Sequence, residues 1–256
     1  CSSDLRDLLA LSPDLRRVNK CDGVLIDVGP DAEKLRSCLS QAKVDAIETL
    51  VLTHFDADHV AGIEGLRGLT VQEVLVSPFR DDRPVVDRVD RVLRSLGSTQ
   101  RQASTGQMGK LGLVSWQVLN PSAQAREAAD SNDASLTMVF DFGEFSLLTL
   151  GDLGQEGQRR LLENHQRLLQ QLRNKPLVVK VAHHGSADQL EELYQFVDPE
   201  LGLFLVGENR YGHPTKASID MVLKTGGSVL RTDRQGPIAI AFEGELRYRA
   251  GGKLSA

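Results

Sequence analysis

Thr53-His-Phe-Asp-Ala-Asp-His59 is the most informative stretch of this chain. Four of its seven side chains can bind a metal ion: His54, Asp56, Asp58 and His59. The apolar run 49–52 before it predicts a buried strand, so the polar side chains lie where a backbone bend can bring them together. Imidazole and carboxylate groups together suit a divalent cation. The alternative is a polar loop with Asp58 as a helix N-cap, but capping accounts for one acid and neither histidine.

The composition is that of an ordinary globular protein. The chain has 256 residues, of which 41% are hydrophobic and 25% charged. Since no linker divides it, we expect one α/β domain over residues 1–256. No apolar run approaches the roughly 18 residues of a membrane span, and residues 1–4 do not begin a signal peptide. The net charge of −5 argues against a global basic field for nucleic acid, although a local basic strip is compatible with it.

The three cysteines, Cys1, Cys21 and Cys38, are odd in number and match no zinc-binding spacing. Cys38 lies beside an apolar helical stripe within residues 31–42, so we predict a buried free thiol. Disulfide bonds are therefore not expected to hold this fold together.

Strands and helices are predicted to mix along the whole chain. Strand patterns occur at residues 23–28, 49–53, 71–77, 113–119, 135–140, 145–150, 177–182, 201–206, 228–232, 237–242 and 245–249. Helical patterns occur in a short segment before Pro13 and at residues 31–42, 84–96, 155–171, 188–197 and 215–225. We expect residues 98–112 to form a loop and residues 120–133 a polar crossing.

Further candidate ligands stand near the ends of other predicted strands. Asp152 follows the strand at 145–150, His183 and His184 follow the one at 177–182, and His213 precedes a predicted helix. Each has a simpler interpretation: a turn residue, a solvated turn and a helix-entry residue. Because a His-Asp cluster lies elsewhere in the chain, Asp152 is better explained as a carboxylate shared by two cations. The pair His183 and His184 is better explained as one metal ligand and one residue that assists it. His213 is equally compatible with either role, and His165, within a predicted helix, is expected at the surface.

The order of these motifs resembles that of the metallo-β-lactamase fold. The resemblance is carried by residues 54–59, 151–152 and 183–185 and by the strand acid Asp27. It implies a four-layer αββα sandwich with metals at one edge, between the sheets. The chain is more specifically similar to the carboxy-terminal domain of the ComEC family of DNA-internalisation competence proteins, on the segments 52–62, 132–135, 151–152, 180–186, 209–214 and 231–236.

Two features depart from that pattern. The opening strand of the family, rich in Gly-Gln-Gly-Asp, is not found in residues 1–20. The wider fold has a histidine where this chain has Asp56, and no histidine occurs from Val60 through Asn164, where residues 132–133 stand instead. The site is thus rich in oxygen donors, which favours manganese or magnesium over zinc, although zinc stays possible.

The resemblance implies roles for each candidate. His54, Asp56 and Asp133 would hold one divalent cation, while Asp58, His59 and His184 would hold the other. Asp152 would bridge the two cations. A metal-activated hydroxide would attack phosphorus, and His183 or His213 would steady the charge or protonate the leaving oxygen. Asp58 is counted with the catalytic groups as well as with the ligands.

The function that these expectations imply is a nuclease of DNA uptake. By resemblance, the parent protein sits in the bacterial inner membrane, and this domain, on the extracytoplasmic side, degrades the DNA strand that is not imported. Its partners would be single-stranded DNA and the membrane channel domain, with no small organic cofactor. Basic candidates for DNA contact are Arg88, Arg91 and Arg94 on one helix, and Arg210 and Lys216 beside His213. The alternatives are a hydrolase of a small ester, phosphorylcholine or lactone, and a non-catalytic domain that guides DNA.

Overall fold

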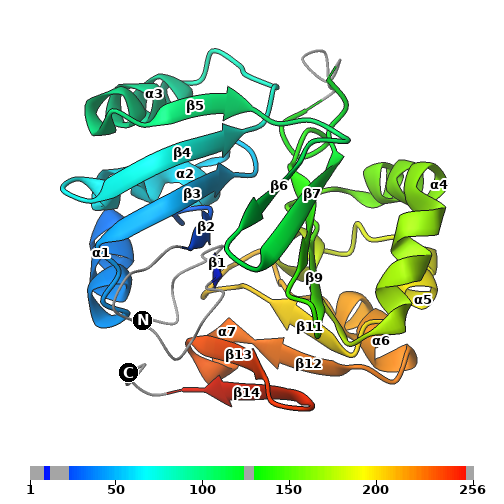
Figure 1. Cartoon of the computed structure of the whole chain (residues 1–256). Helices are drawn as coiled ribbons and strands as arrows, with labels where there is room; N and C mark the ends of the chain where they lie inside the picture. Colours follow the sequence, from blue (N-terminus) through cyan, green and yellow to red (C-terminus); the bar gives the residue numbers. More distant parts are fainter. Residues whose placement is uncertain (1–8, 12–22, 124–129, 252–256) are drawn as a thin grey trace.

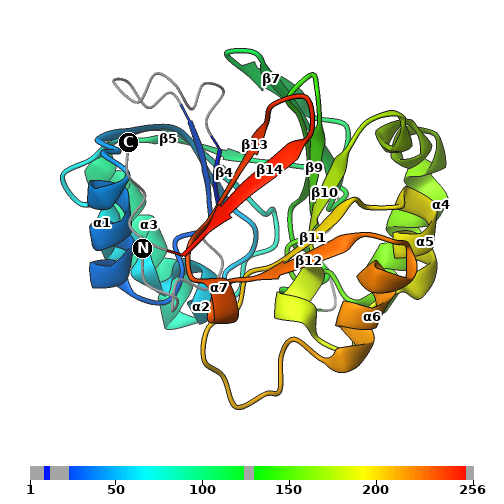
Figure 2. The same ribbon diagram turned by 90° about the horizontal axis from the view of Figure 1, so that it is seen from below.

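Two β-sheets face each other in the computed structural model, which describes residues 9–11, 23–123 and 130–251. The five-stranded sheet has the order β1-β2-β3-β4-β5, and the seven-stranded sheet has the order β12-β11-β10-β9-β8-β7-β6. Helices α1, α2 and α3 lie outside the first sheet, and helices α4, α5 and α6 lie outside the second (Figure 1, Figure 2). The predicted αββα sandwich is therefore confirmed.

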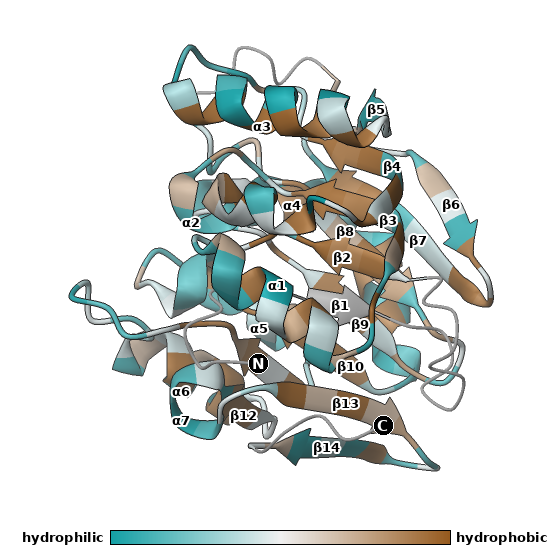
Figure 3. Cartoon of the chain, turned by 90° about the vertical axis from the view of Figure 1, so that its left-hand side faces the viewer, coloured by the Kyte–Doolittle hydropathy of each residue, from teal (hydrophilic) through white to brown (hydrophobic). Residues whose placement is uncertain are grey.

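The first half of the chain forms the five-stranded sheet. Its strands are β1 (Leu9–Leu11), β2 (Val24–Ile26), β3 (Ala46–Leu52), β4 (Thr70–Val76) and β5 (Thr99–Gln102). All neighbours are parallel except β1 and β2. The covering helices are α1 (Ala32–Gln41), α2 (Ala57–Val60), η1 (Ala61–Leu66) and α3 (Pro84–Leu96). Figure 3 shows the hydrophobic strands β2 to β4 beneath helices whose outer faces are more hydrophilic.

The second half of the chain forms the seven-stranded sheet. Strands β6 (Met108–Leu111), β7 (Val114–Asn120), β8 (Thr137–Asp141) and β9 (Ser146–Thr149) are antiparallel. Strands β10 (Leu177–Lys180), β11 (Leu201–Phe204) and β12 (Ser228–Arg231) continue parallel to β9. The helical segments are α4 (Gln155–Gln171), η3 (Leu172–Asn174), η4 (Ala182–Gly185), α5 (Glu191–Val197), α6 (Lys216–Lys224) and α7 (Thr232–Gln235). A separate antiparallel hairpin pairs β13 (Ile238–Phe242) with β14 (Leu246–Ala250).

The space between the sheets is filled by apolar side chains from both of them. One buried cluster joins Ile26, Val51 and Leu75 of the first sheet to Trp116 and Phe140 of the second. Burial of this kind contributes about 25 cal/mol for each Å² of apolar surface removed from water, so this layer fixes how the two sheets face each other. No helix in the described part of the chain is both long and apolar enough to cross a lipid bilayer.

The expected loop at residues 98–112 is wrong, because β5 and β6 lie within it. Every residue of Thr99–Gln102 is exposed and polar, so no alternation of apolar side chains marks the strand. Backbone pairing holds it instead, with Glu73 opposite Thr99. The short helix expected before Pro13 is also wrong at Leu9–Leu11, which pair with β2; the rest of that segment lies outside the described residues.

Two single-residue predictions also need correction. Cys38 is disulfide-bonded and not a free thiol, and the other two cysteines of the chain lie outside the described residues. His165 is half-buried, and its Nε2 lies 3.0 Å from the carbonyl oxygen of Leu119. Helix α4 departs from helical geometry at this residue, with φ −126°. His165 thus ties α4 to the end of β7, which a helical pattern alone does not reveal.

Candidate metal centre

The carboxyl ends of parallel strands from both sheets meet at one edge of the sandwich. Asp27 follows β2, residues 53–59 follow β3, Asp152 follows β9 and the histidine pair follows β10. Backbone hydrogen bonds join these segments, from His183 N to Gly151 O at 3.1 Å and from Val28 N to His59 O at 2.9 Å. Gly62 lets the chain approach β2 closely here, because a Cβ at this position would lie 2.4 Å from the Val28 carbonyl oxygen. Such an edge is where open α/β sheets place ligands.

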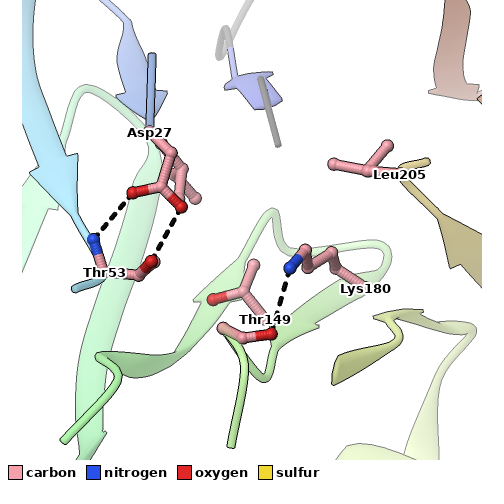
Figure 4. Close-up of a pocket in the computed structure, with 7 residues that line it drawn as sticks. Asp27, Thr53, Thr149, Lys180 and Leu205 are labelled. Atoms are coloured by element: carbon pink, nitrogen blue, oxygen red, sulfur yellow. Dashed lines mark hydrogen bonds between the residues drawn. The ribbon is translucent and has the colours of Figure 1, made fainter. Parts of the chain in front are cut away.

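Asp27 orients the imidazole of His59. Its Oδ1 accepts from Thr53 N at 2.8 Å and its Oδ2 accepts from Thr53 Oγ1 at 2.7 Å, as Figure 4 shows. Oδ2 also lies 2.9 Å from Nδ1 of His59. A carboxylate can only accept hydrogen bonds, so this contact places the ring proton on Nδ1 and leaves the lone pair of Nε2 for a metal.

Asp152 lies at the centre of four imidazoles. Its Oδ2 is 3.2 Å from Nε2 of His59, 3.7 Å from that of His184, 3.9 Å from that of His183 and 4.0 Å from that of His54. The side chain is only 3% exposed. Because one oxygen faces four nitrogens from both sheets, it is the group best placed to be shared by two cations.

Two sets of donor atoms are compact enough to hold a metal ion. The first joins His54, His59 and Asp152, and the second joins Asp58, His59 and His184; within each set the donor atoms lie within 4.8 Å of one another. The second set has the composition expected from the sequence. In the first set, His59 takes part where the sequence suggested Asp56 and Asp133.

Asp56 lies beside the first set, and one of its carboxylate oxygens already accepts a hydrogen bond from Arg83. Its Oδ2 is 3.9 Å from Nε2 of His54, while its Oδ1 accepts from Nη1 of Arg83 at 2.7 Å. Arg83, from the loop between β4 and α3, also donates to Asp81 Oδ2 at 2.7 Å and to Ser131 Oγ at 3.2 Å. The arginine therefore holds Asp56 in place and leaves one carboxylate oxygen for a cation. Sequence analysis missed Arg83.

Asp133 does not join the cluster. Its Oδ1 accepts from Arg160 Nη2 at 3.0 Å, so this carboxylate faces helix α4. The preceding residue behaves differently: among the described residues, the buried Oδ1 of Asn132 has no hydrogen-bond partner. An amide oxygen is a ligand that hard cations accept, so Asn132 Oδ1 is the atom of this segment that stays available to a cation among the described residues.

Residues 183–185 form a left-handed turn directly after β10. The φ angles of His183, His184 and Gly185 are 47°, 53° and 84°, and such angles cost energy for residues other than glycine. The turn brings His184 Nδ1 to 2.9 Å from the carbonyl oxygen of Leu205 and its Nε2 to 3.2 Å from Asp58 Oδ2. Because a carbonyl only accepts, the proton of His184 lies on Nδ1 and Nε2 faces the cluster.

The buried groups have the protonation states that metal ligands need. Burial, together with the neighbouring His59, lowers the pKa of His54 to about 4, so its imidazole is neutral at pH 7. Burial alone would raise the pKa of Asp152, but the electrostatic influence of the neighbouring His59 and Lys180 holds it well below its usual value. Lys180 is itself buried, and its Nζ lies 3.5 Å from Asp152 Oδ1. Nζ also donates to the Gly151 carbonyl oxygen at 3.0 Å, the hydrogen bond drawn at Lys180 in Figure 4.

A divalent cation fits this donor set. The buried Nε2 of His54 has no hydrogen-bond partner among the described residues. A buried polar atom of this kind calls for an explanation, and a metal ion supplies one. An ionised Asp152 and a neutral His54 are ready to bind without first losing a proton.

A cleft of about 600 Å³ opens beside the cluster. Its lining includes Asp56, Asp58, His183 and His184, together with His213 and other residues of its loop. His213 is half-buried, and burial together with the nearby His183 and His184 lowers its pKa. Its ring centroid lies 5.7 Å from that of His183. Both histidines expected to act on a substrate therefore face one cleft.

Comparison with known proteins identifies the fold and the relatives. The sequence profile of the metallo-beta-lactamase superfamily matches residues 18–200. The chain is 26% identical over 211 residues to ComE operon protein 3 of Bacillus subtilis and 28% identical over 202 residues to competence protein ComA of Neisseria gonorrhoeae. These matches cover 81% and 78% of this chain but only 26% of each relative. Zn²⁺-bound PqqB from Methylobacterium extorquens shares the fold, with a TM-score of 0.55 at 12% identity over 87% of this chain and 84% of that one.

Proposed function

Because the chain belongs to the metallo-beta-lactamase superfamily, we propose that it is the metal-dependent phosphodiesterase domain of a DNA-uptake protein and that it hydrolyses single-stranded DNA. The names of its two competence relatives support the DNA-uptake context. Since the chain spans about a quarter of each relative, the remainder of the parent protein would supply the channel that passes the other strand.

One observation carries the proposal: Asp152 Oδ2 faces four imidazole nitrogens within 4.0 Å, with Asp56 and Asp58 beside them. His54 and Asp56 would hold one cation, Asp58, His59 and His184 the other, and Asp152 both. Two such cations supply an activated water and stabilise the attacking and leaving oxygens of a phosphodiester.

The protein's own groups prepare and complete the reaction. Asp27 and the Leu205 carbonyl fix the ring protons of His59 and His184 on Nδ1, and Lys180 balances the charge of Asp152. His213, which lines the cleft, can steady the charge on the leaving oxygen by donating a hydrogen bond from its ring N–H. His183 is the second candidate for this role.

Manganese is the metal that we propose for this site. Three carboxylates, Asp56, Asp58 and Asp152, lie among the donors, and the segment after β7 contributes no histidine. Oxygen donors favour hard cations, whereas imidazole-rich sites suit zinc. The proposal therefore rests on ligand hardness.

Arg210 is the basic residue best placed to contact the DNA backbone. It is exposed on the loop beside His213 and has no ion pair among the described residues. Lys216 is a weaker candidate than the sequence suggested, because it pairs with Asp220 one helical turn away. On α3, Arg88 lies 3.9 Å from Glu64, so that helix offers less free positive charge.

The extracytoplasmic side of the membrane is the location that we propose. The disulfide bond of Cys38 favours an oxidising compartment, since such bonds are rare where glutathione keeps thiols reduced.

A substrate panel tests the proposed reaction. Protein supplied with Mn²⁺ is incubated with single-stranded DNA, duplex DNA, a small phosphodiester, phosphorylcholine and a lactone, beside the variant Asp152→Asn. We expect cleavage of single-stranded DNA that the variant lacks. Hydrolysis of phosphorylcholine or the lactone with intact DNA would instead favour a small-molecule hydrolase, and DNA binding without any hydrolysis would favour a guiding domain.

A further inference from the structure

The loop between β11 and α6 projects from the body of the protein (Figure 2), and its residues Asn209, Tyr211 and His213 line the cleft. Tyr211 lies on this loop, lines the same cleft as Asp58 and His184, and is 80% exposed. A large aromatic side chain with this exposure gains little from the core, so its ring stays available to a ligand in the cleft.

Asn209 holds this loop in a defined shape. Its Oδ1 accepts from the backbone N–H groups of Tyr211 at 3.1 Å and His213 at 3.0 Å. Its Nδ2 donates to the carbonyl oxygens of Gly207 at 3.0 Å and His213 at 2.8 Å. Gly212, with φ 78°, permits the reversal between the two rings. The loop is thus ordered before any ligand arrives, which favours binding because less conformational entropy is lost.

The Tyr211 ring is oriented, although it is not buried. Its centroid lies 6.2 Å from that of His213, and the two ring planes differ by 30°. One side of the tyrosine is therefore turned towards a histidine of the cleft wall, while most of its surface stays open to solvent. The cleft is also lined by the exposed, apolar Pro30, which can pack against a sugar or a base.

We propose that Tyr211 is a stacking platform for an unpaired nucleobase and that it makes the cleft selective for single strands. The inference rests on the proposed function and names the feature of the substrate that the site recognises. Stacking on an aromatic ring accepts any base, since every base has a π face. In a duplex the bases stack on one another and reach such a ring only after unpairing, which costs energy. The neighbouring Arg210 is suited to the phosphate of the same nucleotide.

Oligonucleotides that differ only in their bases test this subsite. One strand carries thymine at every position, and a second of equal length carries abasic sugars at alternate positions, so that the two have the same number of phosphates. For the wild-type protein with Mn²⁺, we expect kcat/KM to be between about 5-fold and about 100-fold higher on the thymine strand. Tyr211→Phe keeps this ratio because it keeps the ring, and Tyr211→Ala brings it close to one.

Tyr248→Ala is the matched control, because Tyr248 is 57% exposed on β14 and does not line the cleft. The control keeps the wild-type ratio. A wild-type ratio close to one, or an unchanged ratio in Tyr211→Ala, would overturn the proposal. If the wild-type protein cuts neither strand, the proposed reaction fails, and binding of the same strands is then measured by fluorescence anisotropy. Tighter binding of the thymine strand that is lost in Tyr211→Ala supports the stacking subsite, and equal binding of the two strands refutes the subsite.

Discussion

Replacing Asp27 with asparagine keeps the shape of the side chain and removes its charge. The carboxylate accepts three hydrogen bonds, from Thr53 N, Thr53 Oγ1 and His59 Nδ1. An amide has one acceptor oxygen, and its nitrogen must face one of these groups. If the nitrogen faces His59, the ring proton moves to Nε2, where a metal would bind. If it faces Thr53 N, two donors meet and a buried backbone N–H loses its partner.

The size of the effect follows from these two arrangements. Groups that orient a metal-ligating histidine typically contribute between about 10-fold and about 100-fold in metal affinity, so we expect Mn²⁺ to bind Asp27→Asn weaker by such a factor. An unpaired buried N–H costs about 1–3 kcal/mol, which would lower the free energy of unfolding of the metal-free protein in the second arrangement. In the second arrangement the amide oxygen still accepts from His59 Nδ1, but it lacks the negative charge that makes Nε2 a stronger ligand, so the affinity for metal falls in either arrangement.

Isothermal titration of metal-free protein with Mn²⁺ measures the affinity, and urea unfolding measures the stability. Asp141→Asn is the control, because Asp141 also accepts from a backbone N–H, that of Gly143 at 2.7 Å, but is the last residue of β8, before the turn into β9. The control should bind Mn²⁺ like the wild type. A folded Asp27→Asn protein with wild-type affinity would show that the Asp27–His59 contact does not orient a metal ligand.

Four further predictions address other parts of the site. Asp152→Ala should lower the rate of DNA cleavage at least about 100-fold in a protein with native circular dichroism, and a near-normal rate would exclude it as the shared ligand. Asp56→His should raise the ratio of activity with Zn²⁺ to activity with Mn²⁺, whereas a wild-type protein active only with Zn²⁺ would refute the argument from ligand hardness. Arg210→Ala should reduce the slope of log affinity for single-stranded DNA against log salt by about 0.7, equally for all sequences, and an unchanged slope would remove it from the interface. The pKa of His54 is lowered from 6.5 to about 4, so between pH 7 and pH 5 the unfolded chain binds a proton that the folded protein does not. The free energy of unfolding of the metal-free protein should therefore fall by about 2 kcal/mol from pH 7 to pH 5, and equal urea midpoints at the two pH values would contradict this.

Most of the framework could be predicted from local patterns. The apolar runs of β3, β4 and β10 and the start of α3 at Pro84 leave local signals in the sequence. Polar residues directly after such runs must gather at one edge when the strands are parallel, which is why the sequence alone could link Asp152 with residues 53–59.

The remainder depends on contacts between distant segments. Arg83 reaches Asp56 across 27 positions of sequence, and nothing near Arg83 in the sequence indicates that contact. Asp133 and Asn132 are equally plausible as oxygen donors, and only the position of Arg160 on α4 decides which of them has a partner within the protein. Strand β5 lacks an apolar face, so its pairing with β4 cannot be read from periodicity.

Activity measured during stepwise addition of metal tests the central claim most directly. Metal-free protein receives Mn²⁺ in increments, and cleavage of a labelled single strand is followed beside the amount of metal bound. The account predicts that full cleavage requires two bound Mn²⁺ per chain and that Asp152→Asn stays inactive at every point. Wild-type protein that binds two Mn²⁺ and leaves the strand intact, or that cleaves it fully without bound metal, would contradict the account.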